Sequence, residues 1–179
     1  SGLSDCSSLT VNGIYKYKIA AENKDLDLVL LAPEQVLKPL SVIEYTTTMP
    51  KIGEQVALSS FPYQGKLNRS TLTEGTVREL EDLGGDKRKF RVSIPVNPGD
   101  SGGGLFDLSG NFIGLHLAEP SYINLDAQIV LKAREITKFL GEVGLSELKR
   151  SYRAEPLDLR QIDSMANRVT ALISCWEQY

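Results

Sequence analysis

Alternating apolar and polar residues predict several short β-strands in the first two thirds of the chain. Residues 14–19 alternate cleanly, and a β-branched segment at 9–11 precedes them across Asn12-Gly13, a pair typical of two-residue hairpin turns. Further strands are predicted at 26–31, 41–45, 89–94 and 112–118.

Helical spacing is confined to the C-terminal part of the chain. Apolar residues at 136, 139, 140 and 143 predict a helix over 134–143, ended by Gly141 and Gly144. After Pro156, apolar residues from Leu157 to Trp176 recur at roughly helical spacing. They predict an amphipathic helix that docks on the rest of the chain or on a partner.

Composition excludes several classes of function. The 179 residues are 41% hydrophobic and 24% charged, which is ordinary for a globular protein. A net charge of -3 gives no electrostatic reason to expect nucleic acid or an anionic membrane as a partner. No run of 18 apolar residues predicts a membrane span.

The chain has few residues that could hold a metal ion. One histidine and two cysteines, Cys6 and Cys175, at opposite ends of the chain do not make a structural zinc site, so neither a metal nor a cofactor is expected. The two cysteines form either a disulfide that closes almost the whole chain or two free thiols, and the sequence leaves both open.

The segment 97–106 carries the strongest chemical signal. Pro98 and Gly99 interrupt regular structure just before Ser101, and three glycines follow it. Such a turn exposes a serine hydroxyl and lets a substrate chain approach closely. Backbone N–H groups beside the serine can then bind a developing oxyanion, as acyl transfer requires.

Residues 99–103, Gly-Asp-Ser-Gly-Gly, resemble the nucleophile motif of trypsin-like (chymotrypsin-fold) serine proteases, and 104–114 resemble the HtrA/Deg branch. Residues 55–62 and 72–77 are similar to two strands of that branch, with Ser60 where glycine is usual. The resemblance covers about residues 7–143.

This resemblance implies an all-β fold of two antiparallel β-barrels, the first incomplete, followed by C-terminal helices. Residues 1–50 would be the remainder of the first barrel, and 51–131 the second barrel, with its last strand at 124–130. Residues 132–179 would form a C-terminal helical extension.

The resemblance also implies roles for individual residues. Ser101 would be the nucleophile, and the N–H groups of Gly99 and Ser101 would form the oxyanion hole. Asp27, at the head of an apolar strand, would orient the catalytic histidine; Asp25 is the competing candidate. Asp100 would either pair with a freed amino terminus or brace the loop.

The general base of a serine protease has no counterpart in its expected place. The one histidine, His116, follows the serine, whereas the family's catalytic histidine precedes the aspartate and would fall upstream of Ser1. Either the chain is a fragment of a longer protease, or another chain supplies the absent strands, or the protein is inactive. We favour the fragment.

Gly114-Leu115-His116 resembles the pocket strand of glutamyl endopeptidases and picornain-like viral proteases. The resemblance implies that His116, with Pro95 and Ala118 nearby, binds a Glu or Gln side chain before the scissile bond; the alternative is a structural histidine. The sequence therefore predicts a serine endopeptidase that acts on peptides or proteins, in a bacterial envelope or a viral polyprotein. The alternative function is an inactive module for peptide binding or assembly.

Overall fold

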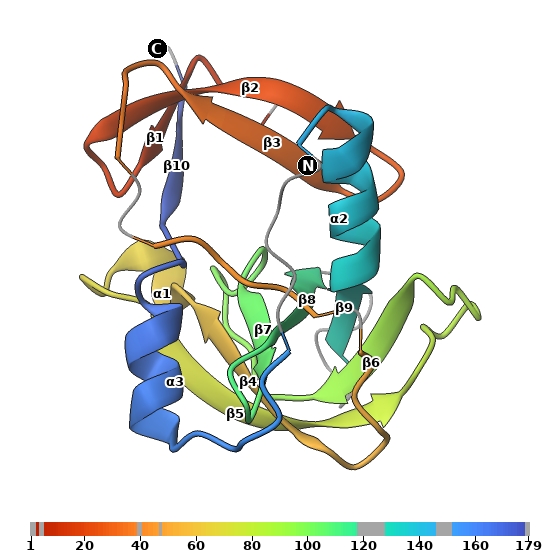
Figure 1. Ribbon diagram of the computed structural model, residues 1–179. Helices are drawn as coiled ribbons and strands as arrows, with labels where there is room; N and C mark the ends of the chain where they lie inside the picture. Colours follow the sequence, from red (N-terminus) through yellow and green to blue (C-terminus); the bar gives the residue numbers. More distant parts are fainter. Residues whose placement is uncertain are drawn as a thin grey trace.

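The computed structural model describes residues 3, 6–38, 41–46, 48–117, 128–145 and 152–177. Their regular structure is mostly β and is divided between two sheets, one above the other in Figure 1. One sheet is open and has four strands, and the other is a closed barrel of six strands. The predicted all-β fold, with one complete and one incomplete barrel, is confirmed.

The open sheet has the antiparallel strand order β10-β1-β2-β3. Its strands are β1 (Ser8–Val11), β2 (Tyr15–Asn23), β3 (Leu28–Pro33) and β10 (Ile173–Trp176). The loop between β1 and β2 has three residues, Asn12, Gly13 and Ile14, because Val11 pairs with Tyr15. The predicted hairpin is thus present, but with a three-residue loop in place of the predicted two; Asn12 and Gly13 have the positive φ angles (53° and 68°) that these residue types tolerate.

The barrel has the strand order β4-β5-β6-β9-β8-β7, and β7 closes it by pairing with β4. Its strands are β4 (Gln55–Ser60), β5 (Thr71–Glu79), β6 (Lys89–Ser93), β7 (Gly104–Asp107), β8 (Phe112–Leu117) and β9 (Gln128–Lys132). The barrel interior is filled by fully buried apolar side chains, among them those of Val56, Leu58, Phe90 and Leu105. Residues 118–127 lie outside the described residues, so the predicted strand at 124–130 is observed only from Gln128.

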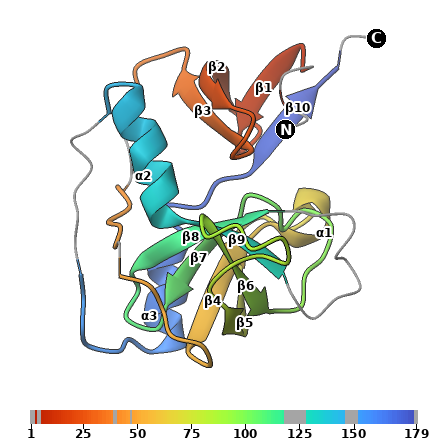
Figure 2. The same ribbon diagram turned by 90° about the vertical axis from the view of Figure 1, so that its right-hand side faces the viewer.

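Three helices complete the described part of the chain: α1 (Pro62–Gly65), α2 (Ala133–Glu142) and α3 (Leu159–Ala166). Figure 2 shows α2 beside both sheets, and the buried Phe139 on this helix packs in one cluster with Leu28 of β3 and Leu131 of β9. The helix predicted over 134–143 is confirmed and joins the two β units.

The helix predicted after Pro156 is correct only in its first part. A capping box at Asp158 starts α3, and the fully buried Ile162 and Ala166 pack on the barrel. The chain leaves the helix after Ala166, and residues 173–176 form strand β10 instead. The apolar positions there suit a helix or a strand, and pairing with the edge of β1 favours the strand.

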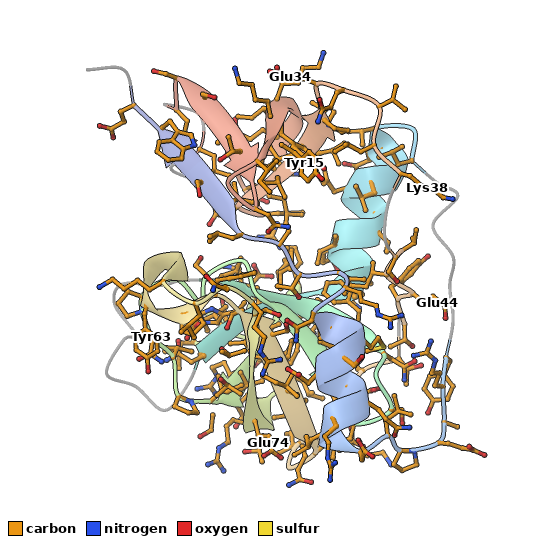
Figure 3. The ribbon with its side chains drawn as sticks, turned by 90° about the vertical axis from the view of Figure 1, so that its left-hand side faces the viewer. Tyr15, Glu34, Lys38, Glu44, Tyr63 and Glu74 are labelled. Carbon is orange, nitrogen blue, oxygen red and sulfur yellow. A yellow bond between two sulfur atoms is a disulfide. The ribbon has the colours of Figure 1, made fainter. Side chains whose placement is uncertain are left out.

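The strand predicted at 41–45 is also wrong. Only Tyr45 makes a β-bridge, parallel to Phe112, and residues 41–44 have no regular structure. Glu44, labelled in Figure 3, lies 3.6 Å from Arg153, so this segment is held partly by side-chain contact with the C-terminal region. In the described ranges, no helix is long and apolar enough to cross a membrane.

Candidate active site

The loop that carries Ser101 connects β6 to β7 and opens onto a pocket of about 420 Å³. Ser101 is exposed, and it lines this pocket together with Gly99, Gly102 and Gly103. Gly99 and Gly102 have positive φ angles (105° and 79°), which favour glycine over residues with a side chain. The glycines therefore allow the sharp turn that presents the serine hydroxyl to the pocket.

Two backbone amides of this loop are available to a ligand. Within the described residues, neither the N–H of Gly99 nor the N–H of Ser101 donates a hydrogen bond to another protein atom. By contrast, the N–H of Gly102 donates to the carbonyl of His116 at 2.8 Å. These two N–H groups therefore have no protein partner in the described part of the chain.

Asp100 lies beneath the loop, with 3% of its surface exposed. Its carboxylate accepts hydrogen bonds from the hydroxyl of Ser60 (2.8 Å) and from the backbone N–H of Asn97 (2.6 Å). The described residues include no cation paired with this carboxylate. Of the two roles expected for Asp100, bracing the loop is the one that this geometry supports.

His116 lies on β8 and has only 3% of its surface exposed. Its Nδ1 is 3.1 Å from the carbonyl oxygen of Asp100; since a carbonyl only accepts, Nδ1 carries the hydrogen. Its Nε2 is 3.3 Å from the side-chain amide of Gln128 on β9, and a neutral ring with its hydrogen on Nδ1 accepts there from the NH₂ group of that amide. Both ring nitrogens thus bond groups inside the protein other than the Ser101 hydroxyl.

The opposite wall of the pocket comes from the C-terminal segment 170–175. The hydroxyl of Thr170 donates to Ser59 in the barrel (3.0 Å), and Leu172 exchanges two hydrogen bonds with Asn12 in the open sheet. Cys175 forms a disulfide with Cys6. This segment therefore bridges the two sheets beside Ser101, which the helical prediction for these residues did not anticipate.

The two candidate aspartates lie in the turn between β2 and β3. Asp27 is exposed, with a φ of 52°, directly after the buried Leu26. Asp25 accepts a hydrogen bond from Arg88, which also binds Asp86 at 2.8 Å. Asp25 is therefore occupied in joining the open sheet to the barrel, and Asp27 is not among the residues that line the pocket at Ser101.

Comparison with known sequences identifies the family. The family of the trypsin-like peptidase domain matches residues 8–115, more than half of the chain. The chain belongs to the trypsin-like peptidases. This match runs from β1 into β8 and includes the loop that presents Ser101.

Two sequence relatives are considerably longer than this chain. An uncharacterized protein of Sinorhizobium fredii, y4bJ, is 29% identical over an alignment of 167 residues, and the match covers 88% of this chain and 26% of that protein. Exfoliative toxin A of Staphylococcus aureus is 28% identical over an alignment of 112 residues, and the match covers 59% of this chain and 37% of the toxin. The chain thus spans about a quarter of the length of y4bJ and somewhat over a third of the length of the toxin.

Solved structures share the trypsin-like fold. The inactive form of Rv3671c from M. tuberculosis has a TM-score of 0.57 at 24% identity, covering 74% of this chain and 67% of that structure. The active form of the Rv3671c protease has the same TM-score of 0.57 at 22% identity, covering 80% of this chain and 62% of that structure. At this level of identity the likeness concerns the fold alone.

The other two residues predicted to bind substrate, Pro95 and Ala118, are not observed at the pocket that Ser101 lines. Pro95 is exposed between β6 and the loop and does not line the pocket at Ser101, and Ala118 lies outside the described residues. Across the described ranges, no three His, Cys, Asp or Glu side chains are grouped so that they could hold a metal ion.

The sequence analysis missed three partners of the site: Ser60, Asn97 and Gln128. Ser60 stood out only as a departure from the family's usual glycine, and its partner Asp100 is 40 residues away. Gln128 carried no signal, because its contact with His116 depends on the pairing of β8 with β9.

Acid should destabilise the fold through Asp86, whose carboxylate holds Arg88 in the loop between β5 and β6. The hydrogen-bonded Arg88 guanidinium lowers the pKa of Asp86 from 3.8 to about 2. Because the folded pKa lies below the unfolded one, this carboxylate contributes stability above about pH 4 that is lost as the pH falls toward about 2. Asp86→Asn should therefore lose less stability between pH 5 and pH 2 than the wild type, measured by urea unfolding.

Arg88→Met is the companion variant, because it removes the partner and leaves the carboxylate in place. It should show the same flattened pH dependence as Asp86→Asn. If the wild type and both variants lose the same stability between pH 5 and pH 2, the ion pair of Asp86 and Arg88 does not contribute to the acid sensitivity of the fold.

Proposed function

We propose that this chain carries the nucleophile of a serine endopeptidase, in which Ser101 attacks a peptide carbonyl and forms an acyl-enzyme. The observation that carries the proposal is the exposed Ser101 at the pocket, on a loop whose Gly99 and Ser101 N–H groups have no partner among the described residues. These donors would stabilise the negative charge that develops on the substrate oxygen.

The general base would come from polypeptide outside these 179 residues. His116 is the chain's one histidine, and both of its ring nitrogens are engaged with Asp100 and Gln128. In the described part of the open sheet, β3 pairs on one side only, so its other edge can accept a further strand. A histidine brought there by an upstream segment or another chain would be oriented by Asp27.

The preference for Glu or Gln before the scissile bond remains a prediction. A substrate side chain would have to replace Gln128 at Nε2 of His116, since Nδ1 is bonded to the Asp100 carbonyl. Peptides that differ only in Glu, Gln, Leu or Val at this position test the idea, and faster cleavage after Leu or Val would refute it.

A second candidate is an inactive trypsin-like module that binds peptides or assembles with partners. It is favoured by one observation, the engagement of the chain's one histidine in structural contacts. The two candidates differ in whether Ser101 is chemically activated.

Labelling with a fluorophosphonate, read by intact mass, distinguishes them. We expect the full-length protein to acquire one label and Ser101→Ala to acquire none, with peptidase activity falling by about 10⁴-fold or more in the variant. The 179-residue chain should label slowly or not at all, because it lacks the base.

Label on another residue, or equal labelling of the wild type and Ser101→Ala, would contradict the assignment of Ser101. Absence of label on folded full-length protein would favour the binding module.

A further inference from the structure

The most unusual feature of the site is the way in which Asp100 is held. A buried carboxylate is costly unless its oxygens accept hydrogen bonds. Asp100 meets this need with one side-chain donor, Ser60, and one backbone donor, the N–H of Asn97. Both donors belong to the chain itself.

Ser60 provides a fixed point on the barrel. It is the last residue of β4, pairs with Thr71 of β5, and has 1% of its surface exposed. It also lies close to the other side of the loop, because a Cβ atom added at Gly103 would be 2.8 Å from the Cβ of Ser60. The Ser60 side chain therefore bonds the loop before Ser101, at Asp100, and lies near it after Ser101, at Gly103.

The carbonyl of Asp100 is fixed as well. It accepts hydrogen bonds from the N–H of Gly103 and from Nδ1 of His116, each at 3.1 Å. The peptide between Asp100 and Ser101 is planar, and in a trans peptide the N–H points away from the preceding carbonyl. Holding this carbonyl against His116 therefore holds the Ser101 N–H in the opposite direction, away from the protein interior.

From these contacts we infer that Ser60 is a positioning residue: through Asp100, it holds the Ser101 loop in the conformation that binds an oxyanion. The inference rests on the proposed role of Ser101 as the nucleophile. The bond from Ser60 to Asp100 makes this conformation a property of the folded barrel, without the need for an amine to pair with Asp100.

The test compares Ser60→Ala with Ser59→Ala. The two serines are neighbours on β4 and each has 1% of its surface exposed, but the Ser59 hydroxyl bonds Ser70 and Thr170 instead of the loop. Each variant loses a buried hydroxyl and keeps the size of the remaining side chain. Only Ser60→Ala removes a donor to Asp100.

Amide hydrogen exchange of the 179-residue chain is the first measurement, because it does not require activity. Ser60→Ala should raise exchange at Gly102 and Gly103 by about 10-fold relative to Ser59→Ala. The amide of Val77, bonded to the Glu54 carbonyl in the barrel, reports any general loss of stability. A rise at the loop no greater than that at Val77 would overturn the inference.

The second measurement is made on the full-length protein. Ser60→Ala should lower the rate of fluorophosphonate labelling and kcat by about 10- to 100-fold with little change in KM, because misplaced oxyanion donors affect the transition state most. Ser59→Ala should lower both by less, because its hydroxyl bonds Thr170 in the pocket wall and makes no bond to the loop. Unchanged kcat in Ser60→Ala would refute the inference while leaving Ser101 as the nucleophile.

If the folded, full-length wild-type protein acquires no fluorophosphonate label, the proposed function fails. The exchange measurement still decides whether Ser60 orders the loop. The two failures are therefore distinguishable.

Discussion

Replacing Cys6 and Cys175 by serine is expected to lower the free energy of unfolding by about 2–5 kcal/mol. The disulfide joins residues 169 positions apart, so it constrains almost the whole unfolded chain. The chain-entropy relation gives about 5 kcal/mol for a loop of this length, and measured effects are often smaller.

Removal of the disulfide should destabilise strand β10 first. This strand has four residues, pairs with β1, and exposes Ile173 and Trp176 by 43% and 53%. The disulfide and the pairing with β1 hold this strand in place, and it has few buried contacts besides them. Without the disulfide, segment 170–175 should therefore separate from the open sheet more readily.

Urea unfolding measures this effect. A reductant should move the midpoint of the wild type to that of the double variant and should leave the double variant unchanged. If the oxidised wild type and the variant unfold at the same urea concentration, the disulfide does not stabilise the fold.

Gly114→Ala is expected to destabilise the barrel by about 3 kcal/mol. A Cβ atom at this position of β8 would lie 2.3 Å from the carbonyl oxygen of Leu131 and 2.7 Å from a methyl carbon of Val130. Strand β9 cannot withdraw easily, because it pairs with β6 on one side and with β8 on the other. The clash would therefore distort the barrel wall.

Gly141→Ala is the matched control. Gly141 lies in α2, and a Cβ atom there would meet nothing within 4 Å. Alanine favours a helix over glycine, so this variant should be neutral or slightly more stable, by up to about 1 kcal/mol. Equal thermal unfolding midpoints for the two variants would refute the steric argument for Gly114.

Features that depend on neighbours in sequence were accessible from the sequence. The hairpin at Asn12-Gly13 needs only two residues that accept positive φ angles, and its strands follow from alternation. The exposed loop at Ser101 likewise follows from the glycines around it. The motif in this loop and the strands around it sufficed to predict the trypsin-like fold.

Local sequence patterns predicted the wrong secondary structure where the same residues could adopt more than one conformation. Residues 173–176 fit a helical pattern, but the edge of β1 was available and the Cys6–Cys175 link supports the strand. Segment 41–45 had the composition of a strand, yet in the described structure only Tyr45 makes a bridge.

The sequence by itself located most strands and an exposed Ser101 on a glycine-rich turn, because each depends on short-range chain geometry. The resemblance of the motif at Ser101 and of its neighbouring strands pointed to the trypsin-like family. Only the tertiary structure decided the partners: Ser60 and Asn97 for Asp100, Gln128 for His116, and Cys175 for Cys6. Most of these contacts join residues far apart in the chain. They depend on strand pairing and burial, which a local pattern of residue types does not specify.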